Sequence, residues 1–162
     1  MKLLFLILLW TSTSAIAGPI EKIQHFFNIA NKDNMRKVCE DFYDEKIIFE
    51  DPISKISGRE DMIKYYNHMY ENVSEIKFKF SNEMAKGNSV YASWTMTLKA
   101  SGLRGGEPVA VDGVSYFEFN KAGKAIYHRD YFDVGSMVYE HIPVLGYAVK
   151  YVKGRLHPKL AP

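Results

Sequence analysis

The sequence has little of several features that would point to a particular class of protein. It holds one cysteine among 162 residues, so no disulfide can form within the chain. Its 21 basic and 19 acidic residues leave a net charge of +2, which provides no electrostatic basis for binding nucleic acid. The glycines in 102–106 lack the Lys-Ser/Thr ending of a phosphate loop, and the five histidines are scattered without metal-ligand spacing. We therefore expect no nucleic acid, no metal and no cofactor.

Long hydrophobic runs are also missing, except at the start of the chain. Leu3 to Trp10 is an apolar run after a short basic start, and Ala15-Ile16-Ala17 follows as a small-x-small site. The run is too short to span a bilayer comfortably. We interpret residues 1–17 as a cleavable signal peptide, with 18–162 as the mature domain in a periplasmic or secreted location. An uncleaved first helix is the alternative.

Aromatic residues are abundant, with 11 tyrosines and 10 phenylalanines, and they suggest a core or cavity lined with rings. Apolar residues recur at helical spacing in 19–30, 35–42 and 57–70. A short strand is expected at 46–49. The period then changes to two, with turns at Gly87-Asn88 and Ala122-Gly123, which predicts a run of four antiparallel strands ending near 134. This order predicts an α+β fold.

The end of the chain has a different pattern. Val138, Ile142, Leu145, Val149, Val152 and Leu156 form one apolar stripe, which predicts an amphipathic helical extension over about 136–156. Pro143 should kink or restart this helix because proline removes a backbone hydrogen bond. The helix could dock on its own sheet or on a partner subunit. Its basic end leaves contact with a membrane surface as an alternative.

Two motifs carry a resemblance to a known family. Phe49-Glu50-Asp51-Pro52 ends a strand that follows two helices, and 116–120 with Gly123-Lys124 forms a characteristic hairpin. With the element order over 20–134, these motifs resemble the NTF2-like superfamily, whose fold is a cone of helices on a curved, mostly antiparallel sheet. The block 128–133 and the stretch 139–146 look more specifically like bacterial SnoaL-like proteins of unassigned function. The resemblance implies the cone and a pocket, but not a single chemistry, because this fold hosts many activities.

Ketosteroid isomerases of this superfamily use the Asp of the acid-Asp-Pro motif as general base, and Asp51 occupies that place here. They also stabilise the enolate with a Tyr from the first helix and a protonated Asp from the fourth strand. This sequence has Phe26 or Phe27 at the first position and Ser115 at the second. The resemblance therefore carries over the base but neither donor.

The last strand supplies the other candidate residues. His128 and Asp130 share one face of it, which we place on the concave side. We expect Asp51, His128 and Asp130 to act as acids and bases, because burial tunes a carboxylate and imidazole titrates near neutrality. The expected ligand-binding residues are Trp94, Met96, Ser115, Phe117 and Phe26. Two alternatives remain open: His128 and Asp130 could form a structural polar network, and Asp51 could serve only as an Asx-Pro turn.

Three functional hypotheses follow from these residues. The first is an exported, cofactor-independent isomerase or dehydratase acting on an apolar, oxygenated small molecule. The second is a non-catalytic module that binds a ligand or a protein, and the third is an interaction protein whose C-terminal helix does the work. We also expect a homodimer, because Tyr127, Arg129 and Tyr131 would otherwise leave a broad aromatic face on the outside of the sheet.

Overall fold

The computed structural model describes residues 18–156. The expected signal peptide and the last basic residues lie outside the described residues. Three helices form one layer: α1 (Pro19–Ile29), α2 (Met35–Phe42) and α3 (Arg59–Glu71). Pro19 stands in the first turn of α1, and Glu60 and Asp61 stand in the first turn of α3, where proline and acids favour a helix start. All three helices match the predicted stretches.

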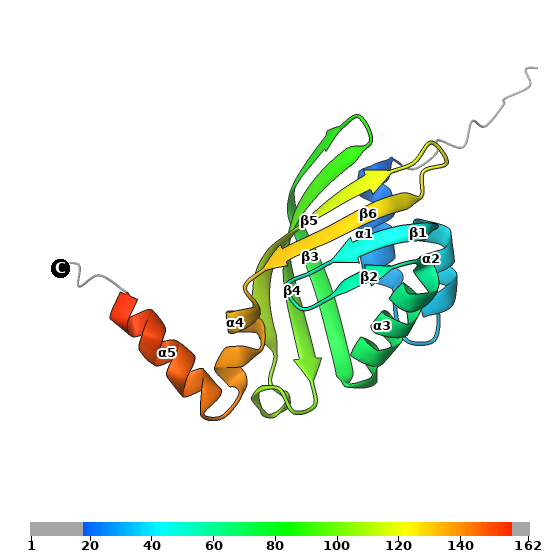
Figure 1. Cartoon of the computed structure of the whole chain (residues 1–162). Helices are drawn as coiled ribbons and strands as arrows, with labels where there is room; N and C mark the ends of the chain where they lie inside the picture. Colours follow the sequence, from blue (N-terminus) through cyan, green and yellow to red (C-terminus); the bar gives the residue numbers. More distant parts are fainter. Residues whose placement is uncertain (1–17, 157–162) are drawn as a thin grey trace, which may run out of the picture.

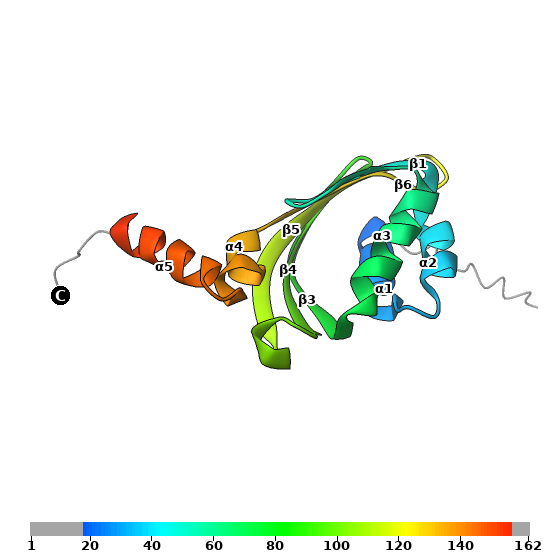
Figure 2. The ribbon, with the colours of Figure 1, turned by 60° about the horizontal axis from the view of Figure 1, so that its bottom comes forward.

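The second layer is a curved six-stranded sheet with the order β2-β1-β6-β5-β4-β3. Its strands are β1 (Tyr43–Glu50), β2 (Lys55–Ser57), β3 (Val73–Lys86), β4 (Ser89–Ala100), β5 (Val109–Phe119) and β6 (Ala125–Phe132). The strands pair antiparallel except for β1 and β6, which run parallel. Figures 1 and 2 show the three helices on the concave side of this sheet. The α+β fold with its long antiparallel run is confirmed.

Two details of the sheet differ from the prediction. The strand expected at 46–49 begins at Tyr43, directly after α2, because Tyr43 turns its side chain into the core. The short strand β2 was not predicted. It pairs with β1 through Ile56 opposite Phe49, and three residues carry too little periodicity to reveal a strand.

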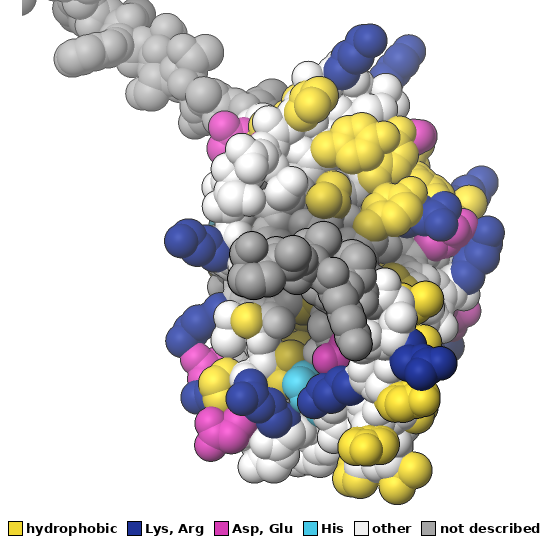
Figure 3. Space-filling model, turned by 90° about the vertical axis from the view of Figure 1, so that its left-hand side faces the viewer, with side chains coloured by type: hydrophobic (Ala, Val, Ile, Leu, Met, Phe, Trp, Pro, Cys, Tyr) yellow, Lys and Arg dark blue, Asp and Glu magenta, His cyan; other side chains and the backbone are white. Residues whose placement is uncertain are grey.

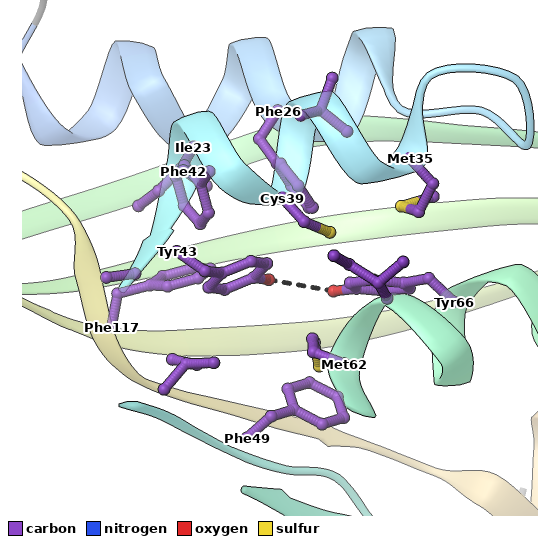
Figure 4. Close-up of a cluster of buried hydrophobic side chains, with 14 of the residues drawn as sticks. Ile23, Phe26, Met35, Cys39, Phe42, Tyr43, Phe49, Met62, Tyr66 and Phe117 are labelled. Carbon is purple, nitrogen blue, oxygen red and sulfur yellow. Dashed lines mark hydrogen bonds between the residues drawn. The ribbon is translucent and has the colours of Figure 1, made fainter. Parts of the chain in front are cut away.

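The main core lies between the three helices and one end of the sheet. It includes Phe26, Phe42, Phe49 and Phe117, and Figure 4 shows their rings packed around Tyr43. Cys39 is fully buried in this cluster, and burial raises the pKa of its thiol to about 12. The prediction of an inert buried thiol is therefore supported by its position.

The C-terminal extension is helical but broken. It consists of α4 (Val134–Met137), the 3-10 turn η2 (Tyr139–His141) and α5 (Leu145–Leu156), with Pro143 in the gap as expected. α5 packs against η2 and projects away from the sheet (Figures 1 and 2). The expectation that this helix docks on the chain's own sheet is therefore wrong. Within 18–156, none of the helices is long and apolar enough to cross a membrane.

Candidate functional site

A cavity of about 260 Å³ lies on the concave side of the sheet, enclosed mainly by aromatic and aliphatic side chains. α1 and α3 contribute one wall, and β1, β3, β4 and β6 contribute the other. The ring-bearing and aliphatic lining residues include Phe27, Phe49, Tyr65, Tyr66, Phe78, Trp94, Met96 and Phe132. Two carboxylates, Asp51 and Asp130, interrupt this apolar surface.

Asp130 reaches the cavity from β6. Side chains alternate along a strand, so His128, Asp130 and Phe132 all face the concave side. Oδ1 of Asp130 accepts hydrogen bonds from Ser115 Oγ at 2.5 Å and from His128 Nε2 at 2.9 Å. Ser115 is directly opposite Asp130 in the pairing of β5 with β6. Among the hydrogen bonds of the described residues, none is donated to Oδ2, so this oxygen is available to a ligand.

A chain of buried donors stands behind Asp130. His128 is fully buried, with its Nδ1 2.9 Å from Tyr43 Oη, which in turn lies 3.0 Å from Tyr66 Oη. Figure 4 shows the contact between the two tyrosines. Burial is the main cause that raises the pKa of Tyr43 and of Tyr66 well above the usual value, so both hydroxyls keep their protons.

This geometry allows only one direction of donation along the series of hydrogen bonds. An ionised carboxylate can only accept, so the contact with Asp130 places the ring proton of His128 on Nε2. Its Nδ1 then accepts from Tyr43, whose oxygen accepts from Tyr66. Each proton in the chain therefore points toward Asp130, and every buried polar atom in it has a partner.

A second chain reaches Asp130 through β4. Nε1 of Trp94 donates to Ser115 Oγ at 2.8 Å, and because indole can only donate, the Ser115 proton goes to Asp130. Gly113 lies opposite Trp94 in the pairing of β4 with β5. A Cβ at Gly113 would stand 2.2 Å from an atom of the indole ring, so the missing side chain is what lets the indole lie across the sheet.

Asp51 lines the same cavity but is more fully engaged. Its Oδ1 accepts from the backbone N–H groups of Ile53 and Ser54, at 2.7 and 2.5 Å, which is the Asx turn that the sequence left open. Its Oδ2 accepts from Tyr65 Oη at 2.5 Å. Burial, followed by this hydrogen bond, raises the pKa of Tyr65. Asp51 therefore shapes the strand end and also presents negative charge to the cavity.

The structure brings most of the predicted site residues together. Asp51, Asp130, Trp94 and Met96 line the cavity, and Ser115 and His128 lie directly behind Asp130. Three predicted ligand contacts, Ser115, Phe117 and Phe26, do not line the cavity. Phe117 is buried, with its ring stacked on His128 at 4.1 Å.

Phe26 belongs to the core, stacked on Phe42 at 4.6 Å. It also borders a separate depression of about 130 Å³ between α1 and α2. Its place in the helix period indicates burial but not which of two neighbouring phenylalanines faces the cavity. Phe27 takes that position.

Several functional residues were missed by sequence reasoning. Tyr43, Tyr65, Tyr66 and Gly113 each belong to an ordinary helix or strand pattern. Only the helical spacing of Tyr66 gave a hint that it points inward. In the described part of the chain, no group of three His, Cys, Asp or Glu residues could hold a metal ion.

Comparison with known proteins finds one matching family model, described as a SnoaL-like domain, over residues 23–128. No curated protein sequence matches the chain significantly. Solved structures do match. An LEH-like epoxide hydrolase from M. tuberculosis is 22% identical, with a TM-score of 0.61 over 84% of this chain and 96% of that one.

A ketosteroid isomerase-like protein from Catenulispora acidiphila, in complex with trimethylamine, is 13% identical, with a TM-score of 0.64 over 76% of this chain and 90% of that one. An NTF2-like protein of unknown function from Burkholderia pseudomallei is 14% identical, with a TM-score of 0.62 over 75% and 95%. Identities this low establish likeness of fold alone.

Proposed function

The chain belongs to the SnoaL-like domain family, with an NTF2-like fold, and on that premise we propose that its cavity carries out cofactor-independent proton transfer on a small, largely apolar molecule. The reaction class is isomerisation or dehydration. Asp130 is the proposed proton acceptor. The M. tuberculosis relative is described as an epoxide hydrolase, which supports a small-molecule role for a cavity of this fold.

The observation that carries the proposal is the asymmetric engagement of Asp130. One oxygen holds two hydrogen bonds from Ser115 and His128, which fix the carboxylate in a single orientation. The other oxygen accepts no hydrogen bond from the described residues, and the carboxylate lines a cavity made mainly of apolar side chains, so this oxygen is the free acceptor for a ligand proton. Asp51 is the base that the resemblance to ketosteroid isomerases implies, but its oxygens already accept hydrogen bonds from Tyr65 and from two backbone N–H groups.

The proton balance of the proposed step is simple. Asp130 Oδ2 takes a proton from a ligand C–H, and the electron pair of that bond moves into a new double bond. In an isomerisation the same proton returns to a different carbon, whereas in a dehydration it leaves with the departing hydroxyl as water. His128 does not touch the ligand. It is a positioning residue that holds Asp130.

Deuterium exchange tests the step that both reactions share. We propose incubating the protein with 2-tetralone in D₂O, because its benzylic C–H beside the carbonyl is acidic enough to need little enolate stabilisation. The wild type should accelerate exchange at that carbon over buffer, as measured by mass spectrometry. Asp130→Asn should return it to the buffer rate, because an amide cannot accept the proton, and Asp51→Asn should retain most of it. A wild-type rate equal to buffer would refute the catalytic proposal.

Binding without catalysis is the second candidate, and one observation favours it. The tyrosine hydroxyls and the indole N–H of the described lining are already engaged within the protein, so a developing oxyanion would find little stabilisation from them. In that case 2-tetralone would bind, as seen by ligand-observed NMR, yet exchange no faster than in buffer.

Export is part of the proposal. We infer cleavage after Ala17 from the basic start, the apolar run and the small-x-small site. The intact mass of the protein recovered outside the cytoplasm should correspond to residues 18–162. A mass that includes residues 1–17 would exclude cleavage there.

A further inference from the structure

We propose that the ligand of this cavity carries a positive charge on nitrogen, as a small hydrophobic amine whose ammonium group faces Asp130. This inference rests on the proposed function only in taking Asp130 as the group that meets the ligand. It concerns which charge the cavity recognises. Because the ammonium group would occupy the oxygen that takes the proton in the proposed step, the amine is a bound ligand of the cavity and not the substrate of that step.

The first argument is that the cavity presents acceptors but no free side-chain donor from its tyrosines and tryptophan. Tyr65 donates to Asp51, Trp94 donates to Ser115, and Tyr66 donates into the chain that ends at Asp130. These three hydroxyl and indole donors of the described lining are therefore consumed inside the protein. A ligand group that needs to accept a hydrogen bond finds no free donor among these three residues, whereas a group that donates finds Asp130 Oδ2.

The second argument is charge. The cavity holds two carboxylates, and the lining formed by the described residues contains no lysine or arginine. Among the salt bridges within 18–156, Asp130 contacts only His128, and Asp51 has none. The lining also includes His68, but its side chain is 81% exposed and its Nδ1 faces Glu71. Both carboxylates accept hydrogen bonds within the protein, but no lysine or arginine of the described residues pairs with them. A cationic ligand would therefore supply the opposite charge that the lining lacks.

The third argument is the surface around the carboxylates. Rings from six elements surround the space, among them Phe49, Tyr65, Trp94 and Phe132. Phe49 and Tyr65 stand with centroids 5.6 Å apart, and Trp94 and Phe132 with centroids 6.3 Å apart. Aromatic faces attract ammonium groups, and more strongly when the site is desolvated. Acidic and aromatic side chains together are a lining suited to an organic cation, and the volume of about 260 Å³ suits a ligand with one ring.

Three one-ring probes of similar size test the inference by isothermal titration calorimetry at neutral pH. N,N-dimethylbenzylamine is protonated, N,N-dimethylbenzamide is a neutral acceptor, and benzyl alcohol is a neutral donor. The amine should bind at least about tenfold more tightly than either neutral probe, a ratio within the range of a desolvated cation–π contact with a charged hydrogen bond. This comparison uses the wild-type protein, so it does not depend on how any variant folds.

Two variants then locate the recognition. Asp130→Asn should weaken binding of the amine about tenfold while leaving benzyl alcohol nearly unchanged, since the amide keeps an acceptor oxygen but loses the charge. Asp133→Asn is the matched control, because Asp133 lies outside the cavity and pairs with Lys153. It should bind the amine as the wild type does.

The inference is overturned if a neutral probe binds as tightly as the amine, if Asp130→Asn binds the amine unchanged, or if the amine gives no binding at millimolar concentration. Its failure can be told apart from failure of the proposed function. If the protein accelerates deuterium exchange in 2-tetralone but does not prefer the amine probe, only the inference of a positively charged ligand is overturned. Tight, Asp130-dependent binding of the amine without exchange would overturn only catalysis.

Discussion

Nε2 of His128 lies 2.9 Å from Oδ1 of Asp130, two positions further along the same strand. Positions two apart on a strand share a face, and the fully buried histidine extends toward the half-buried carboxylate at the cavity wall. The pair connects the core to the cavity. The histidine side is closed by Tyr43, and the carboxylate side is open to a ligand.

His128→Gln should lower the stability of the protein. The glutamine amide can replace Nε2 as the donor to Asp130, but it lies one carbon beyond the position of the ring Nδ1. Tyr43 therefore loses its acceptor, at a cost of about 1–3 kcal/mol. Thermal unfolding followed by circular dichroism should show a melting temperature several degrees lower. Asp51→Asn is the control, because an asparagine carbonyl can still accept in the Asx turn, and it should melt close to wild type. Equal melting temperatures for His128→Gln and wild type would contradict the view that His128 joins buried hydrogen bonds to Tyr43 and Asp130.

Gly113→Ala should change the cavity more than the fold. The new Cβ would collide with the indole of Trp94, so the ring must move and its hydrogen bond to Ser115 is lost. We expect binding of N,N-dimethylbenzylamine to weaken several-fold in calorimetry. Gly154→Ala, on the exposed part of α5 where nothing lies within 4 Å of a new Cβ, should leave it unchanged. Unaltered binding in Gly113→Ala would show that the indole is not held as described.

The protein should lose stability at alkaline pH. Burial raises the pKa of the Cys39 thiol from 9.0 to about 12, so the unfolded chain releases this proton at lower pH than the folded one. The stabilising effect is complete below pH 9.0 and declines by about 1.4 kcal/mol per pH unit until the folded thiol titrates near pH 12. Tyr43 and Tyr66 act in the same direction. Urea unfolding at increasing pH should show this slope, and Cys39→Ala should make it shallower. A stability independent of pH above 9.0 would contradict the burial.

The convex face of the sheet should mediate a homodimer, as the sequence predicts. Tyr91 and Tyr131 are each about half exposed there, and the Arg129 guanidinium lies 4.9 Å from the ring centroid of Tyr131. Aromatic side chains and arginine are typical of protein interfaces. Sedimentation velocity at micromolar concentration should show a dimer that Tyr131→Glu dissociates. Tyr147→Glu, on the projecting α5, is the control and should remain dimeric. A wild type that sediments only as a monomer would refute the proposal.

The projecting helix α5 should bind anionic membranes while contributing little to the stability of the body. Tyr147 and Leu156 are about 80% exposed, and Lys150 and Arg155 add positive charge with no acidic residue in the helix. Figure 3, seen from the side of α5, shows surface hydrophobic groups interspersed with lysine and arginine. Such a helix suits the interface of a negatively charged bilayer.

Vesicles of phosphatidylcholine with phosphatidylglycerol should therefore retain the protein, and vesicles of phosphatidylcholine alone should not. Deleting residues 143–162 should abolish retention and change the melting temperature by no more than about 2 °C, since about 1 kcal/mol shifts a domain of this size by 2–4 °C. Lys121→Glu, in the exposed turn after β5, should still bind. A large loss of stability on deletion would instead mean that the helix supports the fold.

Local patterns in the sequence were sufficient for the helices, for the four long strands and for the faces of those strands, but not for the short strand β2. Trp94 and Met96 alternate with Thr95 and Thr97 along β4, and they point inward as predicted. Asp130 faces the concave side for the same reason, and Pro143 interrupts the C-terminal helix where its missing N–H requires. These features depend on neighbours along the chain, which is why one sequence reveals them.

Contacts between distant parts of the chain were decided only by the tertiary structure. Tyr43 meets His128 across 85 positions because β1 pairs parallel with β6, and no local period encodes that pairing. The engagement of Asp51 by Tyr65 and the place of Gly113 beneath Trp94 depend on register in the same way. A hydrogen bond requires the donor and acceptor atoms to be placed within a few tenths of an ångström. The periodicity of a sequence predicts only which face of a helix or strand a side chain takes. The sequence by itself therefore determined which face of its strand each of these side chains takes, and the packing of the helices and the register of the sheet determined which of them reach the cavity and which of them meet.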